Sequence, residues 1–263
     1  MSIRTSPWPA GMPCWTDLSV PDVDAVTSFY ADVLGWTYQG TGEDYGGYVI
    51  AGVGGAIAAG IGPAREGGPV GWTLYFASDD ADRTAAEIAE HGGSVLLPPG
   101  DVGPFGRMLI AADPTGATFA VWQAGTHIGA GIVNEPGGLM WEDLRSPDPD
   151  GARAFYEALF GFRTEPLAAA GPDYALFHLA GEQAPLGGMG GMFGIEGMPA
   201  HWLVYFAVAD AAAAVAAAER SGGSVLRPAL DTPYGTMAGL ADPAGAVFWV
   251  AQTTGDGQPD RSG

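Results

Sequence analysis

The sequence predicts an α+β protein made of two tandem domains, each of them a pair of βαβββ units. The first observation behind this prediction is a long internal repeat, in which PDVDAVTSFYADVLGW returns as PDPDGARAFYEALFGF. Trp15 and Trp141 are 126 residues apart, and the DP dipeptides that begin at Asp113 and Asp242 are 129 apart. An offset near half of the 263 residues indicates one duplicated domain, because solenoid repeats are shorter and more numerous.

Landmarks between these two ends keep the same order in both halves. Tyr75-Phe76 matches Tyr205-Phe206 with an offset of 130, and GGSVL occurs at 92–96 and 222–226. The dipeptide Asp44-Tyr45 is matched with Asp173-Tyr174 at an offset of 129. We therefore predict a first domain over residues 1–124, a linker over 125–138, a second domain over 139–253 and a polar tail over 254–263. Each domain is long enough to bury a core of its own.

The second observation is the order of secondary-structure signals within each half. A strand at 14–20 is followed by a helix whose apolar residues recur at helical spacing up to Gly35, which is expected as a left-handed C-cap. Three short strands follow at 36–39, 45–51 and 56–61. A second unit repeats the pattern, with a strand at 72–77, a helix at 80–91 and strands at 94–97, 107–111 and 117–123. This order defines two βαβββ units in each half.

Composition excludes several classes of function. The chain has ten arginines, no lysine and 30 acidic residues, so its formal net charge is −20 and nucleic acid is not expected as a partner. Without lysine there is no Schiff base and no phosphate-loop lysine. No apolar run reaches the length of a membrane span, so no membrane partner is expected. The single cysteine and the absence of a signal-peptide pattern predict a cytoplasmic protein.

These motifs together resemble the vicinal oxygen chelate superfamily. They are F-Y-x-x-x-(L/F)-G-(W/F) on the first helix of each half, G-G-S-V-L, and D-P-x-G before the last strand. The superfamily includes glyoxalase I, extradiol dioxygenases, fosfomycin-resistance enzymes and bleomycin-binding proteins, and its two-domain actinobacterial members are the most similar. The resemblance implies that the curved mixed sheets enclose a cavity in each half.

The resemblance also implies where a metal ion would be bound. Metal-binding members place ligands on the first strand, on the first strand of the second unit and on the final strand. The corresponding residues here are Trp15, Thr73 and Ala120 in the first half, and Trp141, Leu203 and Trp249 in the second. None of these side chains is a usual ligand of zinc, iron or manganese. We therefore expect no metal site at the family position and no cofactor.

Alternation along the strands predicts what takes the place of the metal. Residues two apart on a strand share a face, so Asp17 points into the cavity with Trp15, and Asp143 with Trp141. Both aspartates are candidate general acids or bases. Aromatic side chains on the same faces, and in the loops at 101–106 and 231–235, are candidate ligand contacts: Trp15, Tyr75, Phe105, Trp122, Trp141, Tyr205, Tyr234 and Trp249.

Each of these residues also has a structural interpretation. The aspartates can cap a turn or accept hydrogen bonds from neighbouring strands, and the tryptophans can belong to the core. His127 lies in the predicted linker and His178 on a strand where the first half is matched with Val49, and a structural role is favoured for both. The glycine-rich stretches at 54–55 and 187–192 lack the context of a phosphate loop.

The pattern leaves three functions open. The first is a metal-independent binding protein for a small, largely apolar, flat or cationic ligand. The second is a metal-free isomerase, hydratase, cyclase or lyase that uses Asp17 or Asp143. The third is a metal-dependent lyase or dioxygenase with a displaced site, which requires Glu142, Asp143 and His178 or His201 to converge. The first cavity is expected to be the roomier, and the protein a monomer or a homodimer.

Overall fold

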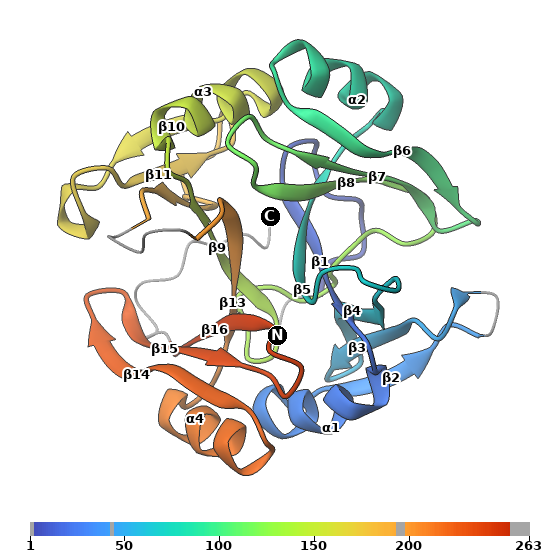
Figure 1. Cartoon of the computed structure of the whole chain (residues 1–263), viewed down its shortest axis with the longest axis vertical. Coiled ribbons are helices and arrows are strands. Elements are labelled where there is room, and N and C mark those ends of the chain that lie inside the picture. Colours follow the sequence, from blue (N-terminus) through green and yellow to red (C-terminus); the bar gives the residue numbers. More distant parts are fainter. Residues whose placement is uncertain (1–2, 43–44, 193–197, 253–263) are drawn as a thin grey trace.

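The computed structural model describes residues 3–42, 45–192 and 198–252, and shows two eight-stranded mixed sheets (Figure 1). The predicted polar tail at 254–263 lies outside the described residues. The first sheet contains strands of the first half alone, and the second sheet contains strands of the second half alone. The predicted fold class, α+β with two tandem domains, is therefore confirmed.

The elements of the two halves follow in the same order. The first half contains β1 (Pro13–Val20), α1 (Val23–Leu34), β2 (Thr37–Gly40), β3 (Val49–Val53), β4 (Ala56–Pro63), β5 (Gly71–Ala77), α2 (Ala81–Glu90), β6 (Ser94–Val102), β7 (Gly106–Ala112) and β8 (Thr118–Ala124). The second half contains β9 (Leu139–Arg145), α3 (Pro149–Phe160), β10 (Arg163–Pro166), a short helix at Ala168–Ala170, β11 (Ala175–His178), β12 (Gly187–Gly190), β13 (His201–Ala207), α4 (Ala211–Arg220), β14 (Ser224–Thr232), β15 (Gly235–Ala241) and β16 (Val247–Gln252).

Each sheet joins two βαβββ units through their first strands. The order of the first sheet is β2-β3-β4-β1-β5-β8-β7-β6, with β1 antiparallel to β5 and parallel to β4. The second sheet repeats this order around β9 and β13. The first strands of the units thus lie at the centre of each sheet.

Local sequence signals explain how α1 begins and ends. The side chain of Asp22 accepts a hydrogen bond from the Ala25 amide at the N-terminus, and Gly35 adopts the left-handed conformation with φ of 71° at the C-terminus. Two predicted strand boundaries were wrong. The strand expected at 94–97 continues to Val102 as β6. The strand expected at 45–51 begins only at Val49, because Gly46 and Gly47 turn the chain with positive φ values of 65° and 84°.

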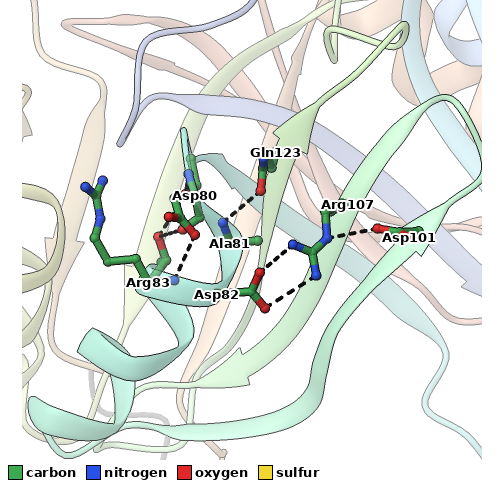
Figure 2. A network of polar contacts seen from close by, with 9 residues as sticks. Asp80, Ala81, Asp82, Arg83, Asp101, Arg107 and Gln123 are labelled. Atoms are coloured by element: carbon green, nitrogen blue, oxygen red, sulfur yellow. Dashed lines mark hydrogen bonds and ion pairs between the residues drawn. The ribbon is translucent and has the colours of Figure 1, made fainter.

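Helix α2 is fixed to the outside of the first sheet by polar contacts (Figure 2). The side-chain oxygen of Gln123 on β8 accepts a hydrogen bond of 2.9 Å from the Ala81 amide at the start of the helix. Arg107 on β7 lies between Asp82 on α2 and Asp101 on β6, and forms ion pairs with both. The second half repeats only the amide contact, from Ala211 to Gln252, so the ion pairs are a local addition of modest energy.

The two halves share one core. Figure 1 shows α1 beside α4 and α2 beside α3, so helices from different halves lie side by side. The largest cluster of buried apolar side chains contains residues of both halves, which differs from the expectation that each half buries its own core. One aromatic cluster contains Phe29, Tyr30, Trp36 and Trp72 of the first half with Phe206 and Phe248 of the second.

A second aromatic cluster repeats the first with the roles of the halves exchanged. Phe76 and Phe119 of the first half pack against Tyr156, Phe160 and Trp202 of the second. A half on its own would expose these rings to water, so the helices of the repeat need the other half to cover them. The duplication therefore produced two halves that pack through a shared core in an approximate two-fold arrangement.

The D-P-x-G motif belongs to this junction. Oδ1 of Asp242 accepts hydrogen bonds of 2.9 Å from the amides of Ala244 and Ala246, and its Oδ2 accepts one of 3.0 Å from the hydroxyl of Tyr30 in the other half. Asp113 likewise binds the amides of Thr115 and Ala117, and burial, together with this nearby carboxylate, raises the pKa of Tyr156. The motif thus has a structural role at both places.

The segment predicted as a linker, 125–138, connects the sheets but is packed against them. Ala130 and Ile132 are buried, and the indole of Trp36 donates a hydrogen bond of 2.7 Å to the carbonyl of Gly137. His127 in this segment reaches the first cavity. None of the helices formed by the described residues has the length and apolar character needed to cross a membrane.

Candidate ligand-binding cavities

The first cavity lies over the first sheet and has a volume of about 410 Å³. Its walls are mostly apolar, and six aromatic side chains line it: Trp15, Tyr45, Tyr48, Tyr75, Phe105 and Trp122. The predicted residues of the first half, including Asp17, therefore all line one cavity. Tyr48, Met108 and His127 also line it, although the sequence did not single them out as site residues.

Asp17 is the acidic group of the first cavity. It lies on β1 two residues after Trp15, opposite Thr73 on β5, and is partly buried. Its Oδ2 accepts a hydrogen bond of 2.8 Å from the Tyr75 hydroxyl and a longer one of 3.4 Å from the Tyr48 hydroxyl. Trp15 donates its indole N–H to the Tyr48 hydroxyl at 3.3 Å. The carboxylate is thus embedded in aromatic side chains.

Burial raises the pKa of Asp17 to about 6, although the hydrogen bonds from Tyr75 and Tyr48 oppose the rise. The same burial and the nearby carboxylate raise the pKa values of both tyrosines well above their ordinary value, so their hydroxyls remain donors. At neutral pH the cavity therefore contains a carboxylate that accepts a proton more readily than an exposed aspartate does.

His127 supplies a second polar side chain from the connecting segment. Its ring packs edge-on against Trp15, with 4.6 Å between the centroids, and lies 5.5 Å from the ring of Trp122. The indole of Trp122 donates a hydrogen bond of 2.8 Å to the carbonyl of His127, which holds the segment in place. Burial lowers the pKa of the imidazole to about 4, so it is neutral at physiological pH.

The turn between β6 and β7 contributes to the lining of the first cavity. Phe105 lies in this turn and packs against the ring of Tyr45 at 5.2 Å between centroids. In the second half, Tyr234 lies in the turn between β14 and β15, lines the second cavity and is 49% exposed. The two predicted loop aromatics therefore occupy the same position, but Phe105 is the better packed.

The second cavity has a volume of about 370 Å³ and lies over the second sheet. Trp141, Asp143, Tyr205 and Tyr234 line it, as predicted for the second half. Trp249 is different, because it is not among the lining residues and stacks on Tyr205 at 5.5 Å between centroids. The two cavities are similar in volume, so a roomier first cavity stays a prediction, and the bulk of Trp249 does not narrow the second.

Asp143 is buried and accepts hydrogen bonds from four side chains. Oδ1 binds the Tyr174 hydroxyl at 2.6 Å and the Trp141 indole at 3.1 Å. Oδ2 binds the Tyr205 hydroxyl at 2.9 Å and the Arg145 guanidinium at 2.5 Å. The ion pair with Arg145 balances the charge of this carboxylate within the protein itself.

The tyrosine pair around each aspartate corrects one match made from the sequence. Tyr174 corresponds to Tyr48, at the offset of 126 seen for Trp15 and Trp141, and Tyr45 belongs to the turn before it. By the same offset His178 corresponds to Gly52, because β2 and β10 pair with these two residues at equivalent positions. The shared Asp-Tyr dipeptide misled the sequence match, since it lies three residues out of structural register.

Close approach by these tyrosines explains glycines on the neighbouring strands. A Cβ atom at Gly60 would lie 1.8 Å from the Tyr48 hydroxyl, and one at Gly188 would lie 1.8 Å from the Tyr174 hydroxyl. Neither strand accepts a side chain at that position without moving the ring. The glycine-rich stretch at 187–192 therefore leaves room for the Tyr174 ring to reach Asp143. This structural role agrees with the prediction that the stretch is not a phosphate loop.

The family is established by comparison with known proteins. The profile described as the Glyoxalase/Bleomycin resistance protein/Dioxygenase superfamily matches residues 14–121 and again residues 127–250. The chain belongs to this superfamily. The two matches follow the two sheets, so the duplicated domain inferred from the repeat is the superfamily domain.

Relatives of similar length share more than a third of their residues with this superfamily member. "Putative glyoxylase CFP32" of Mycobacterium tuberculosis is 40% identical over 255 residues, which cover 94% of this chain and 97% of that protein. "Anthracycline biosynthesis protein DnrV" of Streptomyces peucetius is 36% identical over 269 residues, covering 96% of this chain and 97% of the relative.

Solved structures agree on the fold at much lower identity. The Mn(II)-bound glyoxalase from Novosphingobium aromaticivorans superposes with a TM-score of 0.68 at 18% identity, covering 96% of this chain and 83% of that one. The 2,3-dioxygenase LapB from Pseudomonas sp. KL28 gives 0.65 at 16% identity, covering 92% and 93%. At these identities the likeness establishes the superfamily fold alone.

The side chains at the family's metal positions do not fit a metal ion. Thr73, which the sequence match placed at the second position, lies opposite Asp17, whereas Tyr75 lies opposite Trp15 and beside Ala120. These positions therefore present rings, a hydroxyl group and a methyl group, which are not usual metal ligands. The described residues, with the gaps stated above, contain no group of three or more His, Cys, Asp or Glu side chains arranged to hold a metal ion. The displaced metal site that would require Glu142, Asp143 and a histidine to converge is therefore not assembled among the described residues.

The two histidines of that displaced site have other contacts. Nδ1 of His178 lies 3.1 Å from the carbonyl of Gln183, and its Nε2 lies 3.8 Å from a carboxylate oxygen of Glu165. Nδ1 of His201 lies 2.8 Å from the carbonyl of Pro199. These contacts hold both rings by local interactions, as the structural interpretation expects for His178.

Proposed function

We propose that the protein binds a small, flat, largely apolar aromatic molecule in the first cavity, without a metal ion or another cofactor. One observation supports this most strongly: an ionisable carboxylate, Asp17, is enclosed by tyrosine and tryptophan rings in a largely apolar cavity. Such rings offer large stacking faces, and a partly buried carboxylate offers one strong acceptor.

The size and the relatives support the same class of ligand. A volume of about 410 Å³ lies within the usual range for small-molecule sites, which runs from roughly 300 to 1,000 Å³. Two relatives, each 36% identical, are named as anthracycline biosynthesis proteins, and anthracyclines contain a flat polycyclic aromatic system. We extend this to the present chain as part of the proposal, together with a cytoplasmic location.

Titration of tryptophan fluorescence with a hydroxylated anthraquinone tests the proposal. Met108 and Met237 occupy equivalent positions on β7 and β15 and line the first and second cavities, respectively. Met108→Trp fills the first cavity and is expected to abolish saturable quenching, whereas the matched control Met237→Trp leaves it in place. Equal binding by both variants would show that the ligand is bound at another place.

Metal independence is tested separately by elemental analysis. The protein is purified without a metal-affinity resin, dialysed, and examined before and after incubation with zinc, iron and manganese. We expect far less than one metal ion per chain in both samples. A tightly held stoichiometric metal would instead support the glyoxalase or dioxygenase chemistry named for the structural neighbours, at a displaced site.

A second candidate function is proton transfer by Asp17. The observation that favours it is the raised pKa of about 6, which places this carboxylate near the value that suits a general base at neutral pH. The reaction would be an isomerisation, hydration, cyclisation or lyase reaction of the bound molecule. Asp17→Asn separates the two candidates, because a base is lost completely while apolar binding persists.

A further inference from the structure

In each cavity two tyrosine hydroxyls surround an aspartate, and we call this arrangement the cage: Asp17 with Tyr48 and Tyr75, and Asp143 with Tyr174 and Tyr205. The two cages differ in whether the protein balances the charge of the aspartate. In the second cavity, Arg145 forms an ion pair with Asp143, and its guanidinium lies 5.4 Å from the centroid of the Tyr174 ring. Both charged side chains are nearly buried, with 12% and 4% of their surfaces exposed. A cation is therefore held at this place by a carboxylate and a tyrosine face.

The first cavity has the same carboxylate and the same tyrosine, but a different residue at the position of the arginine. Ser19 lies 126 residues before Arg145, and the strands pair it with Gly71 just as they pair Arg145 with His201. Ser19 does not line the first cavity, whereas Arg145 lines the second. In the first cavity, Asp17 and Tyr48 therefore face open space at the place where the Arg145 guanidinium lies in the second cavity.

Other titratable groups near Asp17 do not balance its charge. Tyr48 and Tyr75 donate hydrogen bonds to it and remain neutral, and His127 in the same cavity is neutral because burial disfavours its charged form. No ion pair joins Asp17 to another side chain within the described ranges. A carboxylate in this environment gains most from a cation that enters with the ligand.

We infer that the first cavity selects an aromatic ligand carrying a cation, such as a protonated amine, and that this cation occupies the place held by the Arg145 guanidinium in the second half. The inference rests on the proposed function and adds the charge of the ligand to it. The net charge of −20 favours the same class, because a negative field concentrates cations near the protein.

The test uses two probes that differ in charge alone. Aminomethyl-anthraquinone carries an ammonium group at neutral pH, and hydroxymethyl-anthraquinone has the same shape without the charge. Calorimetric titration of the whole chain is expected to show a preference of roughly tenfold for the ammonium probe. Asp17→Asn is expected to remove that preference while the alcohol binds as before.

Introducing an arginine into the first cavity tests the cation site more directly than removing the carboxylate does. Ser19→Arg supplies the first cage with the cation that the second cage has, and is expected to reverse the preference so that the ammonium probe binds more weakly than the alcohol. Ser19→Met introduces similar length without charge and controls for lost volume. Circular dichroism of each variant shows whether it is folded. If Ser19→Arg is unfolded, the probe preference of Asp17→Asn decides whether the cation site exists.

The outcomes separate the inference from the proposed function. If both probes bind equally well to the unchanged protein, and Asp17→Asn affects neither, the cation site is wrong but the aromatic cavity remains. If neither probe binds, the proposed function itself fails. A preference for the ammonium probe that persists in Asp17→Asn would also overturn the inference, because the cation would then be bound by another group.

Discussion

The two cavities show how one ancestral site acquires different electrostatics through a single position. Both present an aspartate to two tyrosine hydroxyls, one from the residue just before β3 or β11 and the other from β5 or β13. Arg145 neutralises the aspartate in the second cavity, while Ser19 leaves it without a cation in the first. The second carboxylate thus contributes to stability through its ion pair, and the first is available to a ligand at the expense of stability.

The largest expected effect concerns the neutralised carboxylate. Asp143→Asn removes the charge that pairs with the nearly buried Arg145 guanidinium, and breaking such a pair costs about 3 to 5 kcal/mol. Urea unfolding at neutral pH measures the loss. A loss below about 1 kcal/mol would show that solvent compensates the pair, and the contrast between the cavities would then be weaker than we describe.

The matching substitution in the first cavity is expected to have the opposite sign. The pKa of Asp17 is raised from 3.8 to about 6 in the folded protein, so the folded state holds this proton more tightly than the unfolded state. Stability therefore falls as pH rises from about 4 to about 6 and then stays level. Asp17→Asn removes this penalty, with a gain of about 3 kcal/mol above pH 6 and none below pH 4.

Urea unfolding of both proteins across this pH range checks the prediction. A gain that persists below pH 4 would mean that the asparagine stabilises the fold for a reason other than charge. A loss at high pH would mean that the two tyrosine hydrogen bonds outweigh the desolvation of the carboxylate.

The tyrosines allow a finer comparison of the two cages. Tyr174→Phe removes a hydrogen bond of 2.6 Å to a buried carboxylate and is expected to cost about 2 kcal/mol. Tyr48→Phe removes a contact of 3.4 Å to a partly buried one and should cost less than about 1 kcal/mol. Equal losses in thermal unfolding would contradict the view that the first cage is the looser one.

The smallest expected effect concerns the aromatic side chains in the two turns that line the cavities. Phe105→Ala removes a ring that packs against Tyr45 at the first cavity, and should weaken binding of an aromatic probe about fivefold. Tyr234→Ala changes an exposed ring at the second cavity and serves as the matched control. Equal effects on the titration would show that the probe is bound in both cavities.

Several features of the fold could be predicted because local interactions decide them. The helix that ends at Gly35 depends on spacing and capping within one segment, and the inward direction of Asp17 depends on strand alternation after Trp15. The start of β3 could not be predicted well, because two glycines delay the strand within a stretch that otherwise has strand-like composition. The correspondence of Tyr48 with Tyr174 was missed for another reason, because the Asp-Tyr dipeptides at 44–45 and 173–174 offered a sequence match three residues out of structural register.

The sequence by itself determined the duplication and the order of the elements, since these depend on residue identity and spacing along the chain. Only the tertiary structure decided that the halves share a core, that His127 enters the first cavity from the connecting segment, and that Arg145 pairs with Asp143. Such contacts depend on how curved sheets place side chains through space, and no periodicity along the chain records that arrangement.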